Sequence, residues 1–310
     1  MSNIGPHSLY CIFAVILLLI IASATRMLLQ SRNKEKDYSE LTQRVRTWWI
    51  IVAILLTALI SGKIGTLVTF GFINFLAMKE LLSIIPTRLY DRRAIFWAYL
   101  SIPVQYYWIG IQWYTMFLIF IPVYLFLFIP IRMVLIGQTK GFIRSAGVIH
   151  WVTMLTVFCL SHMAYLTVLP VQNNAAGPVG ALLFLLALTQ LSDVFQYVFG
   201  KLFGKTKIVP LVSPNKTWEG FIGGLVTVSI LSTIMAPYLT PLSSLHGLFI
   251  GSIIAVAGFF GDLVISAVKR DLQIKDCSSL LSGHGGAMDR LDSLTYTAPI
   301  FFHYLIYFYY

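Results

Sequence analysis

Charged side chains are scarce in this sequence of 310 residues. Only 11% of the residues are charged and 58% are hydrophobic, whereas soluble domains carry roughly 25% charged residues. A water-soluble chain of this composition would have too few polar side chains to cover its own surface, so that class is excluded. The excess apolar surface must face lipid.

Cysteine is also scarce, and histidine shows no metal-binding pattern. The three cysteines are Cys11, Cys159 and Cys277, and no two of them form a CxxC pair. The six histidines are scattered without the spacing of metal ligands. These absences exclude a disulfide framework and a zinc site.

Acidic residues are too few to balance the basic ones, which leaves a net charge of +10. Such a balance is typical of nucleic-acid-binding proteins, but here the basic residues occupy short loops between apolar runs. We therefore expect no nucleic-acid partner. Loops of this kind favour anionic lipid headgroups and phosphates as partners.

Long apolar runs are what the sequence does contain. Ten stretches approach or reach the roughly 17–25 residues that cross a bilayer as a helix. They lie at about 8–29, 48–62, 64–86, 94–111, 114–136, 146–170, 178–200, 220–237, 247–268 and 293–310. Because no more than two residues separate the second stretch from the third, and the fourth from the fifth, nine spans is an alternative count. The prediction is an all-α, polytopic integral membrane protein with nine or ten transmembrane helices, the first of which is retained rather than cleaved.

The basic residues predict how the chain crosses the membrane. All but one of the 22 lysines and arginines fall in or beside the odd-numbered connections, and the exception is Lys63. Since positive charge is retained in the cytosol during insertion, the odd-numbered connections should be cytosolic and both termini outside. From its compactness and lack of targeting tails, we expect the chain in a bacterial inner membrane, with an active site on the cytosolic face.

Polar chemistry is concentrated toward the C-terminus. Seven of the 12 acidic residues lie between Asp193 and Asp292. We therefore divide the chain into an N-terminal transmembrane scaffold, residues 1–175, and a C-terminal transmembrane catalytic region with cytosolic loops, residues 176–310.

Two aspartates stand near the cytosolic ends of predicted spans. Asp193 and Asp262 would each cost roughly 2.5–3.5 kcal/mol if placed well inside the bilayer, so a cation, a substrate or a charged partner must balance them. An internal ion pair with Lys201 or Lys269 is the structural alternative. Asp262, Ser266 and Lys269 are spaced to share one helix face, which indicates a polar stripe facing a cavity.

The segment 269–292 combines three features of a phosphate and metal site. Its basic residues can neutralise phosphates, its Gly-rich run 283–286 allows successive N–H groups to approach an anion, and its paired carboxylates can bind a hard cation such as Mg²⁺. The residues concerned are Lys269, Arg270, Lys275, Gly283, His284, Gly285, Gly286, Asp289 and Asp292. Each feature alone is weak, and their combination in one loop predicts a site.

A second polar loop, residues 213–220, precedes the predicted helix at 220–237. Ser213 or Thr217 can cap that helix, and Glu219 suits its first turn. Capping does not explain Lys216, which stands just before a helix N-terminus where a phosphate would dock. Gly220 and Gly224 indicate close helix packing.

These segments resemble the phosphatidate cytidylyltransferase family, also called CDP-diacylglycerol synthases. The family signature runs S-x-x-K-R, four residues, K-D, a short Gly/Ser segment, H-G-G and D-R-hydrophobic-D. It is matched here by Ser266, Lys269, Arg270, Lys275, Asp276, His284, Gly285, Gly286, Asp289, Arg290 and Asp292. The block 213–220 resembles the family's S-P-x-K-T-x-E-G, and the helix from Asp193 to Lys205 resembles a third block.

The resemblance implies transfer of CMP from CTP to the phosphate of phosphatidic acid, with release of pyrophosphate. It implies Mg²⁺ held by Asp262 and Asp289, and it leaves open a second cation such as K⁺ and a homodimer. The residues expected in catalysis are Asp262, Ser266, Lys269, Arg270, Lys275, Asp276, His284 and Asp289. The residues expected to bind nucleotide, metal or lipid phosphate are Asp193, Ser213, Lys216, Gly285, Gly286, Arg290 and Asp292.

Three alternatives remain beside this interpretation. Departures from the family's usual residues at Ser278, Ser282 and Ala287 favour a divergent bacterial paralogue, and another lipid phosphate is then an alternative acceptor. A CTP-dependent polyprenol kinase is disfavoured by the complete H-G-G and D-R-x-D blocks. An ion-coupled transporter is disfavoured because the polar residues cluster on one side of the membrane and the chain shows no repeat.

Overall fold

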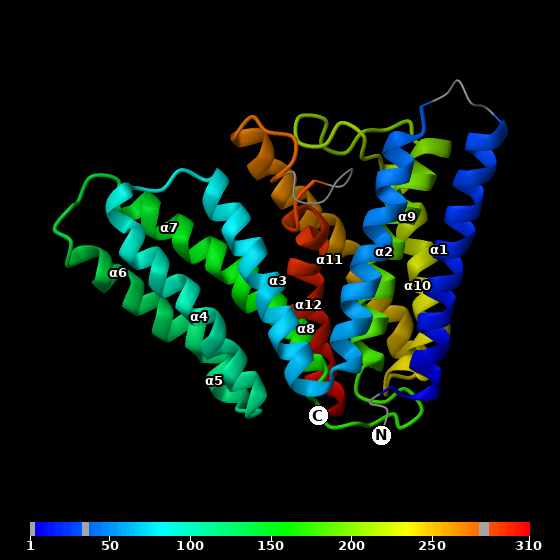
Figure 1. The fold of residues 1–310 in the computed structure, drawn as a ribbon, viewed down its shortest axis with the longest axis horizontal. Coiled ribbons are helices and arrows are strands. Elements are labelled where there is room, and N and C mark those ends of the chain that lie inside the picture. Colours follow the sequence, from blue (N-terminus) through cyan, green and yellow to red (C-terminus); the bar gives the residue numbers. More distant parts are fainter. Residues whose placement is uncertain (1–3, 33–36, 279–284) are drawn as a thin grey trace.

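The computed structural model describes residues 4–32, 37–278 and 285–310 (Figure 1). Within these ranges the regular elements are all helices, and Lys207 and Thr217 form an isolated antiparallel bridge. The all-α prediction is confirmed. His284 lies outside the described residues.

Ten helical rods match the ten apolar stretches one for one. They are α1 (Pro6–Arg32), α2 (Ser39–Ile60), α3 (Gly62–Ile84), α4 (Arg92–Gly110), α5–η2–α6 (Tyr114–Ile119, Phe120–Leu125, Phe126–Val134), α7–η3–α8 (Phe142–Thr153, Met154–Cys159, Leu160–Leu166), α9 (Gly180–Phe203), α10 (Trp218–Leu239), α11 (Ser244–Asp271) and α12 (Met288–Tyr309). The π-helical turns η2 and η3 interrupt two rods without ending them, and the 3₁₀ turn η1 (Leu89–Asp91) precedes α4.

Both of the narrow separations between stretches are real breaks. Gly62 has a φ of 75° between α2 and α3, and Gln112 has a φ of 57° between α4 and α5. Among the described helices, eight are long and apolar enough to cross a membrane. The polytopic prediction is confirmed. The two rods outside those eight are α4 and α12, whose many tyrosines, tryptophans and polar residues lower their mean hydropathy.

The rods alternate in direction. In Figure 1 both termini lie at the bottom of the molecule, the ends of α1, α3, α9 and α11 that lead into the next connections lie at its upper end, and the α6–α7 connection lies at its left. These are the odd-numbered connections that carry the basic residues, so charge and architecture agree.

Helices α9 to α12 pack in sequence, and α3 reaches them from the N-terminal half. Helix α10 packs along α9 and α11, α11 packs against α12, and α12 also contacts α3 and α8. At Gly220 the contact between α10 and α9 is between backbones, because a Cβ there would lie 2.6 Å from the Gln196 carbonyl oxygen. The structural interpretation of Gly220 and Gly224 is confirmed. The division between residues 1–175 and 176–310 stays a prediction.

Candidate functional site

Three aspartates from three helices gather at the upper end of this bundle. Asp193 lies on α9, Asp262 on α11 and Asp292 on α12. The Ser293 hydroxyl donates to both Asp193 oxygens at 3.3 and 3.2 Å, and the Ser293 N–H donates to Asp292 Oδ1 at 2.8 Å. The three carboxylates repel one another electrostatically. Such a concentration of negative charge in an apolar bundle needs a cationic partner.

Lys216 supplies one positive charge to this group. Its Nζ lies 2.7 Å from Asp262 Oδ2, donates to the Phe259 carbonyl oxygen at 3.2 Å, and stands 4.2 Å from the centroid of the Phe259 ring. Asp262 Oδ1 accepts a hydrogen bond from Ser266 Oγ at 3.1 Å. Asp262 therefore does form an internal ion pair, but with Lys216 of the α9–α10 connection rather than with Lys201 or Lys269.

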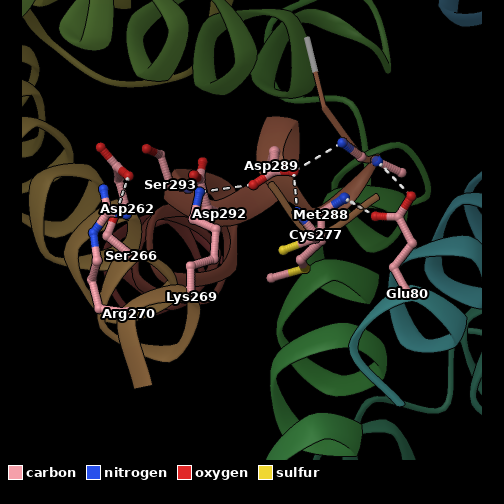
Figure 2. Close-up of polar contacts among 12 residues, drawn as sticks. Glu80, Asp262, Ser266, Lys269, Arg270, Cys277, Met288, Asp289, Asp292 and Ser293 are labelled. Atoms are coloured by element: carbon pink, nitrogen blue, oxygen red, sulfur yellow. Dashed lines mark hydrogen bonds and ion pairs between the residues drawn. The ribbon is translucent and has the colours of Figure 1, made fainter. Parts of the chain in front are cut away.

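Lys269 pairs instead with Asp289. Its Nζ lies 2.8 Å from Asp289 Oδ1, while Asp289 Oδ2 accepts from the N–H groups of Cys277 and Gly286, each at 2.8 Å (Figure 2). The expected stripe of Asp262, Ser266 and Lys269 is thus split between two carboxylates. Asp289 receives one ammonium and two backbone donors, so its charge is well stabilised despite burial.

Asp289 also fixes the loop before it. Gly285 has a φ of 77°, a conformation that favours glycine, and a Cβ there would lie 2.7 Å from Asp289 Oδ2 and 3.2 Å from Asp276 Oδ1. Cys277, whose N–H also donates to Asp289, has a buried side chain. Burial, together with the nearby negative charge of Asp289, raises the pKa of the Cys277 thiol to about 12, so this thiol is not a nucleophile at neutral pH.

The second polar loop is held by its own caps. Thr217 Oγ1 accepts from the Gly220 N–H at 3.2 Å and caps α10. Glu219 accepts from the N–H groups of Lys205 at 3.0 Å and Thr206 at 3.1 Å. The capping role of Thr217 is confirmed, and these contacts present Lys216 toward α11.

The remaining predicted residues lie around the two ion pairs. Arg270 Nε donates to the Val212 carbonyl oxygen at 3.2 Å, which joins α11 to the loop containing Ser213. Lys275 and Asp276 are exposed on the connection after α11. Arg290 is half-buried on α12, and its buried Nε has no hydrogen-bond partner among the residues that the structure describes. Such an orphaned donor is suited to an incoming anion.

One residue at this site was missed by sequence reasoning. Glu80, on α3, is buried and accepts hydrogen bonds from the start of α12. The signal was present, because an acidic residue at position 80 interrupts an apolar stretch just as Asp193 and Asp262 do. Its partner was not visible, since the contact spans 207 residues of sequence.

The donor chemistry fits a hard cation without presenting a complete cage for it. Proteins usually bind Mg²⁺ through one or two carboxylates, water and substrate phosphate. Within the described ranges, no three His, Cys, Asp or Glu side chains form a metal-binding group. The Asp262 side chain is 29% exposed and that of Asp289 is 3% exposed. Of the two carboxylates, that of Asp262 would be the more accessible to a cation, and Asp289 would bind a cation only by giving up its ion pair with Lys269.

Known proteins are similar to this chain in sequence. A family model described as the cytidylyltransferase family matches residues 42–308. An uncharacterized protein of Escherichia coli strain K12, YnbB, is 45% identical over 301 residues, which cover 97% of this chain and 98% of that protein. The phosphatidate cytidylyltransferase of Staphylococcus haemolyticus is 32% identical over 263 residues, which cover 83% of this chain and 96% of that protein. That of Chlamydia muridarum is 43% identical over 131 residues, 40% of this chain and 42% of that protein.

Proposed function

We propose, from the premise that this chain belongs to the cytidylyltransferase family, that it transfers CMP from CTP to phosphatidic acid. The family makes the chain a membrane nucleotidyltransferase, and the lipid acceptor is the specific element of the proposal. One observation supports it: two cation–carboxylate pairs, Lys216–Asp262 and Lys269–Asp289, share helix α11, which supplies Asp262 to one pair and Lys269 to the other. A site that must hold both a metal and phosphates needs both signs of charge.

The reaction joins two polyanions. An oxygen of the lipid phosphate attacks the α-phosphorus of CTP, the bond from that phosphorus to the oxygen bridging the β-phosphate breaks, and pyrophosphate leaves with the electron pair. The attacking phosphate monoester is already ionised at neutral pH, so no strong general base is needed. The barrier is mainly electrostatic repulsion and alignment, which positioned charges reduce.

The residues of this chain have distinct parts in that task. Lys216 and Lys269 hold their carboxylates in place before substrate binds and become phosphate ligands when a cation takes over those carboxylates. Arg290, with its unpaired Nε, and the exposed Lys275 extend the positive surface toward the nucleotide or the lipid headgroup. Asp262 and Asp289 would hold Mg²⁺, which when bound neutralises and aligns the phosphate oxygens.

The membrane orientation belongs to the same proposal. The end of the molecule that carries the two ion pairs also carries the odd-numbered, basic connections. Retention of positive charge in the cytosol would place this end where CTP is available, in a bacterial inner membrane. Lipid phosphate would reach the site from the inner leaflet.

The test is an assay of the purified full-length chain in detergent or lipid vesicles. Labelled CTP and Mg²⁺ are supplied with phosphatidic acid, and in parallel with a polyprenyl phosphate and a lysophosphatidic acid. We expect a CDP-lipid and stoichiometric pyrophosphate with phosphatidic acid. Product with a different lipid phosphate alone would replace the acceptor, and absence of CDP-lipid with every acceptor would sink the enzymatic proposal.

A further inference from the structure

Glu80 connects the N-terminal half of the chain to the loop that holds Asp289. Its Oε1 accepts from the Ala287 N–H at 2.9 Å and from Ser278 Oγ at 2.6 Å, and its Oε2 accepts from the Met288 N–H at 2.8 Å. Figure 2 shows the Glu80 side chain extending from α3 toward these donors. Its carboxylate is therefore the N-terminal cap of α12, supplied by a different helix.

The position of Glu80 favours its interaction with α12 over interaction with its own helix. It lies close to the C-terminal end of α3, where the helix dipole disfavours a negative charge, whereas the N-terminus of α12 favours one. Helix α12 has no cap of its own, because its N-cap residue is Ala287. Glu80 is also 6% exposed, so solvent contributes little to its stabilisation.

Glu80 and Asp289 both accept hydrogen bonds from the two described arms of the loop. The first arm ends at Ser278 and the second begins at Gly285. Asp289 Oδ2 binds the N–H of Cys277 on the first arm and that of Gly286 on the second. Glu80 binds Ser278 on the first arm and the start of α12 on the second. Each of the two carboxylates thus holds both arms. The position of one carboxylate therefore restricts where the donors of the other can lie.

The backbone is shaped to admit the Glu80 carboxylate. A Cβ on Gly286 would overlap Glu80 Oε2, so only glycine leaves room for it. An amide in its place would turn one N–H group toward backbone donors, because glutamine offers a single acceptor oxygen where glutamate offers two.

We propose that Glu80 is a positioning residue of this enzyme, which holds the loop and the first turn of α12 so that Asp289 faces Lys269 and the metal. The proposal rests on the proposed function for its kinetic consequence, although the loop contact itself does not. It extends the site to the N-terminal half, which sequence reasoning treated as scaffold. Glu80 acts through Asp289 and touches no substrate.

The kinetic test compares Glu80→Gln and Glu80→Asp with a matched control, Lys79→Gln, whose side chain is adjacent and exposed. We expect Glu80→Gln to lower kcat and to raise the Mg²⁺ concentration for half-maximal activity, each by roughly 10- to 100-fold, with Glu80→Asp intermediate. KM for the lipid should stay unchanged. A variant that merely lost folded protein would lower kcat without moving its Mg²⁺ dependence.

A second pair of variants reports on the contact itself. Ser278→Ala removes one of the three hydrogen bonds to Glu80, so it should shift the Mg²⁺ dependence in the same direction by a smaller factor. In the Glu80→Gln background it should add no further shift, since residues that act through one contact are not additive. Fully multiplicative effects would contradict the proposed linkage.

Thiol labelling tests the loop without requiring activity. Cys277 is 3% exposed and adjoins Ser278, which binds Glu80, so we expect faster maleimide modification of its peptide in Glu80→Gln than in wild type or Lys79→Gln, measured by mass spectrometry on folded protein. Unchanged labelling with an unchanged Mg²⁺ dependence would overturn the inference. If wild type forms no CDP-lipid, the proposed function fails and labelling alone decides whether Glu80 holds the loop.

Discussion

At the scale of residues, the ion pairs determine how much stability and activity would be lost when an aspartate is replaced. Asp289 is almost fully buried and satisfies three donors, including Lys269. Removing one partner of a buried charge pair leaves the other uncompensated. Asp289 therefore has a structural part in addition to its expected part as a ligand of Mg²⁺.

We predict that Asp289→Asn lowers turnover by roughly 10²- to 10³-fold, because the isosteric amide keeps the packing and loses the charge. The measurement is CDP-lipid formation beside thermal unfolding in detergent. Asp271→Asn, at the exposed end of α11, is the control and should retain wild-type turnover. Wild-type turnover in Asp289→Asn would remove the metal role.

Sequence reasoning identified the charged residues of the site but not all of their pairings. The spacing of Asp262, Ser266 and Lys269 correctly places Asp262 beside Ser266, yet Lys269 turns toward Asp289. Spacing defines which side chains share a helix face, whereas the pairing depends on which neighbouring helix approaches. That information is tertiary, and for Glu80 it comes from α3.

At the scale of elements, glycines set how closely α9 and α10 approach. A Cβ on Gly220 would lie 2.9 Å from Gly200 Cα and 3.0 Å from Gly200 N. Backbone atoms cannot rotate away as a side chain can, so the helices must separate. Because α10 follows the loop with Lys216, separation would also move that lysine.

We predict that Gly220→Ala destabilises the chain by about 1–3 kcal/mol, the usual cost of overpacking a tight contact. Gly147→Ala is the matched control, because Gly147 lies within α7 and a Cβ there meets nothing within 4 Å. The control should be neutral or slightly stabilising, since alanine favours helix more than glycine does. Equal melting temperatures for both variants would contradict the backbone-contact argument.

The connection between α3 and α4 depends on a buried carboxylate. Arg88 donates to Asp91 at 2.7 and 2.8 Å, and the Ser145 hydroxyl also donates to it. Burial by itself raises the pKa of Asp91, but the hydrogen bonds from Arg88 and Ser145 outweigh it and lower that pKa below its ordinary value. This carboxylate therefore favours the folded state while it is ionised.

The pH dependence follows from that direction. A carboxyl group with a lowered folded pKa stabilises the fold above its unfolded pKa, about 3.9, and loses this effect as pH falls through the folded value. We predict that the melting temperatures of wild type and Asp91→Asn differ most at neutral pH and converge below about pH 4. A difference in melting temperature that stays constant as the pH falls would show that the ionised Asp91 carboxylate does not stabilise the fold.

At the scale of the whole molecule, alternation of the helical rods places the basic connections at one end. Composition and charge predicted this arrangement well, because both follow from the lipid environment and from insertion. The breaks at Gly62 and Gln112 were ambiguous in sequence, since hydropathy averages over the one or two residues that reverse the chain. Backbone geometry resolves them.

We predict that both termini and the even-numbered connections are on the non-cytosolic side of the membrane. In a chain whose native cysteines are replaced by serine, an impermeant maleimide should modify Asn174→Cys, between α8 and α9, in intact cells. Lys140→Cys, between α6 and α7, should react only after permeabilisation. The reverse pattern would invert the orientation and move the proposed active site away from CTP.

The fit between Gly286 and Glu80 also constrains how such a sequence can diverge. Any larger side chain at position 286 would meet the Glu80 carboxylate, while a shorter side chain at position 80 would leave the N–H groups of Ala287 and Met288 without their acceptor. A substitution at either position alone would destabilise this contact. We therefore expect a substitution at position 80 or 286 to be tolerated best when the other position changes with it.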